Sequence, residues 1–249
     1  MAIEESFDRV ADGYASFRPH YPEALFDLVA SHCANRGMAW EVGCGSGQAT
    51  VELAARFDRV EACDPAPTAI ANAPPIPGVH FSVGRAESSL LADGEADLVA
   101  SAQAAHWFDM PAFAEEARRV GTPEAIVAVW TYDRPRIDPE LDTIQDHLYF
   151  EVLEGCWDPR RAYVDSLYTT LPFPFEDIEV SAPNITMEWT RDHLLGYLRT
   201  WSAVQEYANR HGEDAVGCIE PDLCKAWKDP DQPRLVQCRV GLRLGRIHG

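Results

Sequence analysis

One stretch decides the fold of this chain: Met38-Ala39-Trp40-Glu41-Val42-Gly43-Cys44-Gly45-Ser46-Gly47-Gln48. An apolar run ends at an acidic residue and continues into alternating glycines, which is typical of a strand, a tight turn and the start of a helix. Because glycine has no Cβ, Gly43, Gly45 and Gly47 let the backbone adopt left-handed conformations and approach a ligand at the helix N-terminus. A cofactor that carries a nucleoside is the expected ligand.

Two kinds of glycine-rich loop compete for this stretch. The dinucleotide fingerprint G-x-G-x-x-G/A needs a small last residue, but counting from Gly43 that place is Gln48, and counting from Gly45 it is Thr50. The pattern E-x-G-x-G-x-G fits throughout and resembles the first motif of class I S-adenosylmethionine-dependent methyltransferases. That cofactor has no pyrophosphate, and Glu41 suits the ammonium group of its methionine moiety. A turn that binds no ligand is the alternative.

Length, composition and charge restrict the class of protein. The chain has 249 residues, 46% of them hydrophobic, which suffices for one sizeable α/β domain or two small ones. The sequence shows neither an apolar run of about 18 residues nor a signal-peptide pattern, so we expect a cytoplasmic protein without a membrane partner. A formal net charge of −19, with only Lys225 and Lys228 as lysines, disfavours a nucleic-acid partner. The seven cysteines form no C-x-x-C pair or zinc spacing, so we expect reduced thiols and no metal.

The segment from Phe7 to Pro22 precedes the glycine loop and is predicted to be mainly helical. It resembles the pattern F-x-x-x-A-x-x-Y-x-x-x-R-P-x-Y-P of a methyltransferase subfamily, in which it forms a lid over the cofactor. The resemblance implies that Tyr14 and Arg18 meet the carboxylate of the cofactor, Arg18 through charge-assisted hydrogen bonds. A packed tyrosine and a solvated arginine are the alternatives.

Asp64 follows a short predicted strand over residues 59–63 and lies 17 residues after Gly47. A carboxylate at the end of a second strand can accept hydrogen bonds from both ribose hydroxyls, as an acidic residue about 20 positions on does in dinucleotide folds. An exposed aspartate or a helix cap before Pro67 is the alternative. The resemblance implies a larger cofactor site, comprising Tyr14, Arg18, Glu41, Gly43, Cys44, Gly45, Gly47, Gln48, Asp64, Pro65, Ala86, Glu87, Gln103 and Ala104.

A second distinctive run, Gln103-Ala104-Ala105-His106-Trp107-Phe108-Asp109, follows an apolar strand predicted over residues 96–101. It resembles the A-x-H-W-F-D signature of the methyltransferase type 11 subfamily, which includes trans-aconitate methyltransferase-like proteins. Open α/β sheets bind ligands at the carboxyl ends of their strands, where this run is expected. His106 is the candidate catalytic base, and a hydrogen-bonded structural histidine is the equally weighted alternative.

Four aromatic side chains are candidates for the wall of an apolar acceptor pocket, and ordinary core packing is the alternative for each of them. They are Trp107, Tyr132, Trp201 and Tyr207.

The seven predicted strands and the helices between them indicate an α/β protein. The resemblance implies a Rossmann-like class I methyltransferase fold, namely a seven-stranded, mostly parallel sheet with an antiparallel last strand and a helical cap. We expect one domain over residues 1–249, with residues 1–132 and 233–249 as the cofactor-binding core and about 133–175 and 184–230 as the cap. Later strands are expected over 126–132, 177–180 and 234–247, and later helices over 111–120, 138–154 and 160–169 and from Thr190 onward.

The expected activity is methyl transfer from S-adenosylmethionine to a small-molecule acceptor, with O-methylation of a carboxylate or hydroxyl favoured. Such a displacement mainly needs alignment of the reacting groups. A carboxylate acceptor is already ionised near neutral pH, whereas a phenol or amine would benefit from His106 as a base. An NAD-type oxidoreductase and a non-catalytic cofactor-binding protein remain as alternatives, and the sequence identifies neither the acceptor nor the oligomeric state.

Overall fold

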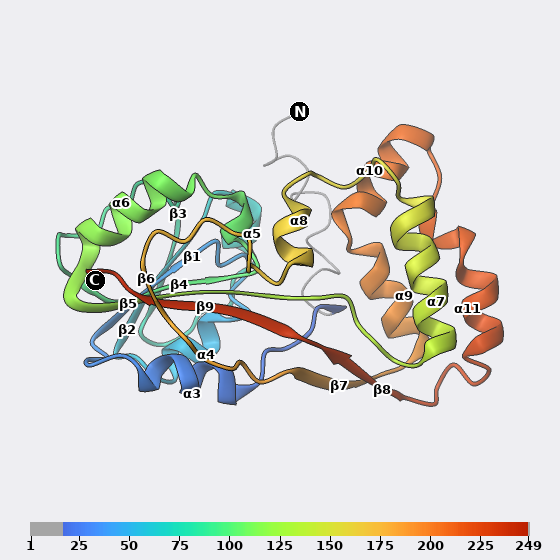
Figure 1. Cartoon of the computed structure of the whole chain (residues 1–249), viewed down its shortest axis with the longest axis horizontal. Coiled ribbons are helices and arrows are strands. Elements are labelled where there is room, and N and C mark those ends of the chain that lie inside the picture. Colours follow the sequence, from blue (N-terminus) through green and yellow to red (C-terminus); the bar gives the residue numbers. More distant parts are fainter. Residues whose placement is uncertain (1–16, 249) are drawn as a thin grey trace. The chain divides into compact units, whose positions relative to one another are not determined.

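The computed structural model describes residues 17–248 (Figure 1). Tyr14 therefore lies outside the described residues. The chain divides into two compact units, each of which is described by itself. Within the described residues, the larger unit comprises His20–Asp133, Ala162–Asn184 and residues 239–248, and the smaller comprises residues 17–19, Arg134–Arg161 and Ile185–Cys238.

A seven-stranded sheet forms the centre of the larger unit, with the strand order β3-β2-β1-β4-β5-β9-β6. The strands are β1 Met38–Val42, β2 Arg59–Asp64, β3 Val79–Val83, β4 Ala96–Ala102, β5 Gly121–Tyr132, β6 Glu176–Ile178 and β9 Val240–Arg246. Strands β1 to β5 pair in parallel, whereas β9 is antiparallel to both β5 and β6. The predicted sheet, with its antiparallel last strand, is confirmed. The order reverses between β1 and β4, which is where open α/β sheets bind ligands.

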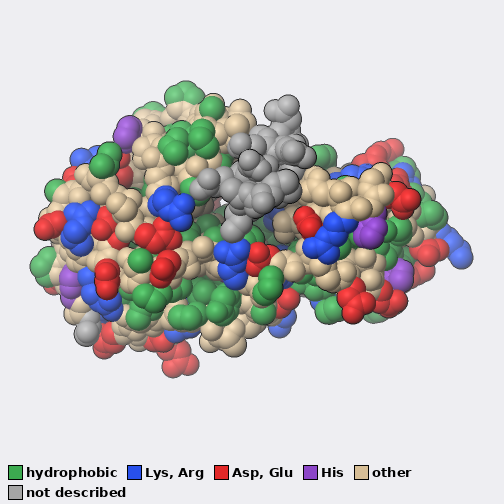
Figure 2. Space-filling view, turned by 90° about the horizontal axis from the view of Figure 1, so that it is seen from above, with side chains coloured by type: hydrophobic (Ala, Val, Ile, Leu, Met, Phe, Trp, Pro, Cys, Tyr) green, Lys and Arg blue, Asp and Glu red, His purple; other side chains and the backbone are tan. Residues whose placement is uncertain are grey.

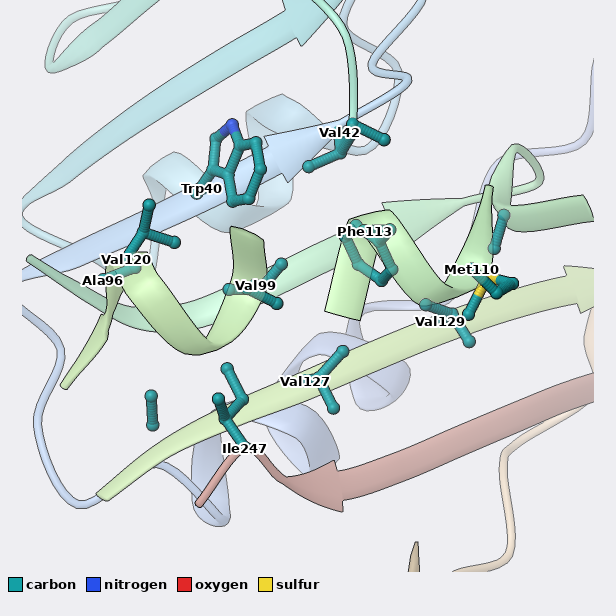
Figure 3. Packing of buried hydrophobic residues seen from close by; sticks show 14 of the residues in the cluster. Trp40, Val42, Ala96, Val99, Met110, Phe113, Val120, Val127, Val129 and Ile247 are labelled. Atoms are coloured by element: carbon teal, nitrogen blue, oxygen red, sulfur yellow. The ribbon is translucent and has the colours of Figure 1, made fainter. Parts of the chain in front are cut away.

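Side chains of successive residues in a strand point to opposite faces, and both faces of this sheet are covered by helices. On one face, Trp40 and Val42 of β1 pack with Phe113 of α6, which spans Met110–Val120 (Figure 3). On the other face, Ala39 packs with α3, which spans Glu23–Ser31. The larger unit therefore has three layers, with α6 on the opposite side of the sheet from α3 (Figure 1).

The remaining helices of the larger unit are short. They are α4 Thr50–Ala54, α5 Pro67–Ala71, the 3-10 helix η1 Ala105–Trp107, and α8 Arg161–Asp165 at the unit boundary. Strand β5 begins at Gly121, five residues before the expected start at residue 126. The early start reflects an irregular register, in which Gly121 pairs with Ala96 and regular pairing begins only at Leu98 with Ile126.

The smaller unit combines helices with a two-stranded antiparallel sheet of β7 and β8. Its elements are α7 Pro139–His147, the π-helix η2 Leu148–Val152, β7 Ile185–Trp189, α9 Arg191–Arg199, α10 Ser202–His211, the 3-10 helix η3 Ala215–Cys218, α11 Glu220–Ala226 and β8 Arg234–Cys238. The carboxylate of Asp138 and the hydroxyl of Thr190 accept hydrogen bonds from backbone amides at the starts of α7 and α9. These caps explain why the two helices begin where the sequence predicts.

The C-terminal strand expected over residues 234–247 is divided between two sheets. Residues 234–238 form β8 and pair with β7, whereas residues 240–246 form β9 in the large sheet. Arg239 marks the division, because its amide and its Nε both donate to the carboxylate of Asp133, at 2.7 and 2.6 Å. The unit boundaries also differ from the expected ones, because residues 162–175 group with the sheet and not with the cap segments.

The distribution of charged side chains and the length of the helices are relevant to nucleic-acid and membrane partners. In Figure 2, arginine and lysine side chains of the described residues are interspersed with acidic ones. No helix within residues 17–248 is both long enough and apolar enough to span a bilayer.

Candidate active site

The glycine loop follows β1 and has the backbone conformation that the sequence predicts. Gly43, Gly45 and Gly47 have φ values of 69°, 57° and 93°, all in the left-handed region that favours glycine. The amides of Gly43 and Cys44 donate to the carbonyl oxygen of Cys63, at 2.8 and 3.1 Å. These bonds fix the start of the loop to the end of β2.

The three glycines have different surroundings. A Cβ on Gly43 would lie 2.4 Å from the Cβ of Ala104, and a Cβ on Gly47 would lie 2.9 Å from Cζ of Phe81. Within residues 17–248, a Cβ on Gly45 would meet no atom within 4 Å. Gly43 and Gly47 therefore allow the loop to pack, whereas Gly45 borders open space in which a ligand can approach the backbone.

Asp64 lies at the end of β2, against the loop. Its Oδ2 accepts a hydrogen bond from the amide of Gly45, and its Oδ1 accepts one from the amide of Ala66, both at 2.9 Å. Burial raises the pKa of the Asp64 carboxyl above its ordinary value, and the two amide donors oppose that rise. A carboxylate offers about four lone-pair sites, so the two amides leave acceptor capacity for the hydroxyls of a ribose.

Glu41 lies beneath the loop and is completely buried. Its Oε2 accepts a hydrogen bond from Oγ1 of Thr50 at 2.5 Å, whereas its Oε1 has no partner within residues 17–248. Burial is the main cause that raises the pKa of Glu41 to about 8; the bond from Thr50 lowers it and the nearby Asp64 raises it. A buried carboxyl with an unpartnered oxygen fits an ammonium group, which would supply both charge and donors. These residues fit a nucleoside cofactor with an amino-acid moiety.

Replacement of Glu41 by glutamine is expected to stabilise the cofactor-free protein at high pH. The pKa of Glu41 is about 8 in the folded protein and 4.5 ordinarily, so folding favours the neutral carboxyl. The resulting cost in the free energy of unfolding therefore grows as the pH rises from 4.5 to 8. Glu41→Gln should remove this penalty, on the order of 2 to 4 kcal/mol at pH 8 and little at pH 5. Urea unfolding of both proteins at the two pH values measures the difference. An equal effect at pH 5 and pH 8 would show that Glu41 keeps one protonation state.

Gln103 and Ala104 follow β4. Gln103 has a left-handed φ of 56° and its amide donates to the carbonyl oxygen of Trp130 at 2.8 Å. Its Oε1 accepts hydrogen bonds from Oγ1 of Thr131 and, at 3.0 Å, from the amide of Tyr132. Gln103 thus fastens the end of β4 to β5, and Ala104 packs against Gly43. A direct contact of either residue with the cofactor stays a prediction.

The other predicted cofactor residues of the larger unit lie near the strand ends. Ala86 is buried and Pro65 is exposed, whereas Gln48 and Glu87 are half-buried. The carboxylate of Glu87 accepts a hydrogen bond from the amide of Asp109 at 3.0 Å, just before α6 begins. Their contacts with the cofactor likewise stay predictions.

His106 lies in η1, beyond the end of β4, and is 8% exposed. Its Nδ1 is 2.8 Å from the hydroxyl of Tyr168, and its ring centroid is 4.8 Å from that of Trp107. Tyr132 is buried and its ring centroid is 5.9 Å from that of Tyr21. The structure thus brings His106 and Trp107 together, whereas Tyr132 packs in the interior.

Three predicted residues belong to the smaller unit. Arg18 donates to the carbonyl oxygen of Thr200 at 3.1 Å. Trp201 is buried in an aromatic cluster, with its ring centroid 5.6 Å from that of Trp157. The ring of Tyr207 lies tilted against that of His211, with the centroids 4.4 Å apart. Each has a partner within its own unit, and their roles toward a ligand stay predictions.

Sequence reasoning missed three residues that support the site. Thr50 holds Glu41, Thr131 holds Gln103 and Tyr168 holds His106. Thr50 could have been found, because a hydroxyl at the start of the helix after the loop lies close to the strand end. Tyr168 is 62 residues from His106, and no local pattern connects the two.

The sheet order, the glycine loop after β1 and the carboxylate after β2 define a Rossmann-like nucleoside-binding fold of the class I methyltransferase type. The family model of the methyltransferase domain matches residues 40–129. A protein of Dictyostelium discoideum that is named as a methyltransferase is 31% identical to this chain. The match covers 92% of this chain and 89% of that protein. The chain therefore belongs to the class I S-adenosylmethionine-dependent methyltransferases, and S-adenosylmethionine is its cofactor.

Solved structures agree with this assignment. A protein of Anaeromyxobacter dehalogenans, provisionally described as a type II methyltransferase, is 43% identical, with a TM-score of 0.85 over 92% of this chain and 98% of that one. A methyltransferase structure from Anabaena variabilis shares the fold, with a TM-score of 0.55 at 17% identity over 88% of this chain and 98% of that one. The predicted methyltransferase class is confirmed, while the trans-aconitate methyltransferase-like subfamily is not specifically supported.

Proposed function

We propose that the protein transfers the methyl group of S-adenosylmethionine to a carboxylate oxygen of a small-molecule acceptor. The observation that carries this proposal is the contact of the Nδ1 atom of His106, which lies 2.8 Å from a phenol hydroxyl. A histidine that acts as a general base is commonly oriented by a carboxylate, which stabilises the imidazolium once it forms. A neutral phenol does not supply that charge, which favours an acceptor that needs no base.

Different residues of the larger unit bind the cofactor and the acceptor in such a reaction. Bound S-adenosylmethionine supplies an electrophilic methyl group. Gly45 leaves room for the cofactor beside the loop, Asp64 accepts from its ribose hydroxyls, and Glu41 receives its ammonium. His106 and Trp107 lie beyond β4 and border the acceptor. Alignment of the reacting atoms is the main contribution that such a displacement requires from a protein.

A small molecule is favoured over nucleic acid as the acceptor. The formal net charge of −19 repels a polyanion, and the basic side chains on the face in Figure 2 are interspersed with acidic ones. The ring of Trp107, whose centroid lies 4.8 Å from that of His106, suits an acceptor with an apolar body.

The test is a methyl-transfer screen with radiolabelled S-adenosylmethionine. The acceptors are phenylacetate, hexanoate and trans-aconitate as carboxylates, 4-nitrophenol as a phenol, and benzylamine as an amine. We expect a methyl ester from at least one carboxylate, at a rate that is flat between about pH 5.5 and 8 because the acceptor stays ionised there. Transfer to the phenol or the amine alone, or to none of the five, would contradict the proposal.

A further inference from the structure

Tyr168 and His106 form a buried pair in the larger unit. Tyr168 is completely buried, and its hydroxyl lies 2.8 Å from Nδ1 of His106. The two ring centroids are 6.0 Å apart, so the rings meet through this polar contact and do not stack closely. Tyr168 follows α8 in the sequence and is no part of the expected site.

The backbone that carries Tyr168 is strained. Leu167 and Tyr168 have φ values of 52° and 63°, and two successive non-glycine residues in the left-handed region are uncommon. Strain of this kind persists only where surrounding contacts enforce it, and it is frequent at functional sites. Contacts with neighbouring residues must therefore hold Leu167 and Tyr168 in this conformation.

Strand β9 supplies these contacts. A Cβ on Gly241 would lie 2.2 Å from the carbonyl oxygen of Leu167, so only glycine admits the turn at this distance. Arg243 donates to the carbonyl oxygen of Tyr168 at 3.3 Å, and its guanidinium pairs with the carboxylate of Asp177 at 2.7 Å. The turn and its tyrosine are thus fixed by an element of the central sheet.

The chemistry of the two groups sets the direction of the hydrogen bond. A phenol O–H, with a reference pKa of about 10, is a stronger acid than the N–H of a neutral imidazole, and an imidazole nitrogen is a stronger base than a phenol oxygen. The hydroxyl of Tyr168 therefore donates and Nδ1 of His106 accepts. This arrangement places the imidazole proton on Nε2.

We propose that Tyr168 is a positioning residue that holds His106 in the Nε2–H tautomer, so that His106 donates a hydrogen bond to the carboxylate of the acceptor and does not remove a proton. This inference rests on the proposed function. A carboxylate oxygen forms a bond to the methyl carbon while the bond from that carbon to sulfur breaks, and the bonding pair remains on sulfur. The acceptor changes from an anion to a neutral ester, and no proton moves. The Nε2–H donor fixes the acceptor oxygen that does not react.

The first test needs no acceptor. Protein labelled with ¹⁵N-histidine is compared with Tyr168→Phe by NMR at pH 7.5, and the signal of His106 among the eight histidines is assigned by its loss in His106→Gln. We expect a protonated Nε2 and an unprotonated Nδ1 in the native protein, and a shifted Nδ1 signal in Tyr168→Phe. Tyr163→Phe removes a hydroxyl from a tyrosine in α8 and is the matched control, which should leave the His106 signals unchanged. A protonated Nδ1 in the native protein would overturn the inference.

The second test uses kinetics with the carboxylate of the screen that is methylated fastest. The loss of one hydrogen bond that positions His106 should raise the acceptor KM in Tyr168→Phe about fivefold to tenfold, with the affinity for S-adenosylhomocysteine unchanged. Tyr163→Phe should match the native protein. An acceptor KM in Tyr168→Phe equal to that of Tyr163→Phe would show that Tyr168 is merely structural.

Two variants of His106 test whether its Nε2–H acts as a donor, even if Tyr168→Phe fails to fold. The amide nitrogen of glutamine can occupy the position of Nε2, whereas that of asparagine reaches only the position of Nδ1. We therefore expect His106→Gln to retain an acceptor KM within about fivefold of native and His106→Asn to lose tenfold or more. A hundredfold loss of the single-turnover rate in His106→Gln, with a native rate that falls at low pH, would make His106 a base and overturn the inference. If no carboxylate is methylated, the proposed function fails, while the NMR result still decides the tautomer.

Discussion

Replacement of Gly45 by leucine is expected to weaken the binding of S-adenosylmethionine a hundredfold or more while the protein stays folded. A Cβ at this position would meet no atom of the described residues within 4 Å, so we expect the leucine side chain to project into the space that the cofactor needs. The left-handed φ of 57° adds a strain of roughly 1 to 2 kcal/mol, which a domain of this size tolerates. Calorimetric titration with S-adenosylhomocysteine measures the affinity, and thermal unfolding without ligand measures the stability.

Gly94 offers a matched control for this variant. It has a φ of 67° and lies in the connection between β3 and β4, and a Cβ there would likewise meet no atom of the described part of the chain within 4 Å. Gly94→Leu should therefore lose a similar amount of stability and none of the cofactor affinity. Native affinity in Gly45→Leu, or the same loss of affinity in both variants, would place the cofactor elsewhere.

Replacement of Asp64 by alanine is expected to weaken cofactor binding by about a hundredfold. Two hydrogen bonds from ribose hydroxyls to a charged oxygen would be lost, which together are worth on the order of 3 kcal/mol. The structure adds a cost in stability, because the amides of Gly45 and Ala66 lose their acceptor. We expect the free energy of unfolding of the unliganded protein to fall by about 1 to 2 kcal/mol. Asp64→Asn keeps one acceptor oxygen and should fall between the native protein and the alanine variant in both measurements.

Asp97 is the matched control for Asp64. Its Oδ2 accepts hydrogen bonds from the amides of Gly37 and Met38, at 2.8 and 3.2 Å, and it lies near the start of β4. Asp97→Ala should therefore reduce the free energy of unfolding without changing the affinity for S-adenosylhomocysteine. If the two alanine variants lost equal stability and neither lost affinity, Asp64 would be a structural residue only.

The features that could be predicted from sequence are encoded locally. The strand, loop and helix start around Gly45 depend on residues that are neighbours in the chain, and so does the position of Asp64 after β2. Hydrophobic patterning likewise predicted where most of the strands lie, because each strand must bury at least one face. The parallel order and the antiparallel last strand were implied by the resemblance to class I methyltransferases. The left-handed glycines followed from the same local chemistry.

The features that could not be predicted depend on contacts between distant residues. Alternation of apolar residues continues through residues 234–247, so nothing in that pattern marks Arg239, whose bonds to Asp133 divide the strand between two sheets. The support of His106 by Tyr168 depends on a left-handed turn at two non-glycine residues, which local preference disfavours. The roles of the aromatic candidates could not be predicted from the sequence either. Tyr132 and Trp201 are buried, and residue type alone does not distinguish a pocket wall from core packing.

We expect the loop at Gly45, together with Glu41 and Asp64, to hold an S-adenosylmethionine-type cofactor. Calorimetric titration of the native protein with S-adenosylhomocysteine, and separately with NAD⁺, tests it most directly. We expect saturable binding of one S-adenosylhomocysteine per chain and no saturable heat with NAD⁺ at the same concentration. Saturable binding of NAD⁺ together with no response to S-adenosylhomocysteine would contradict it.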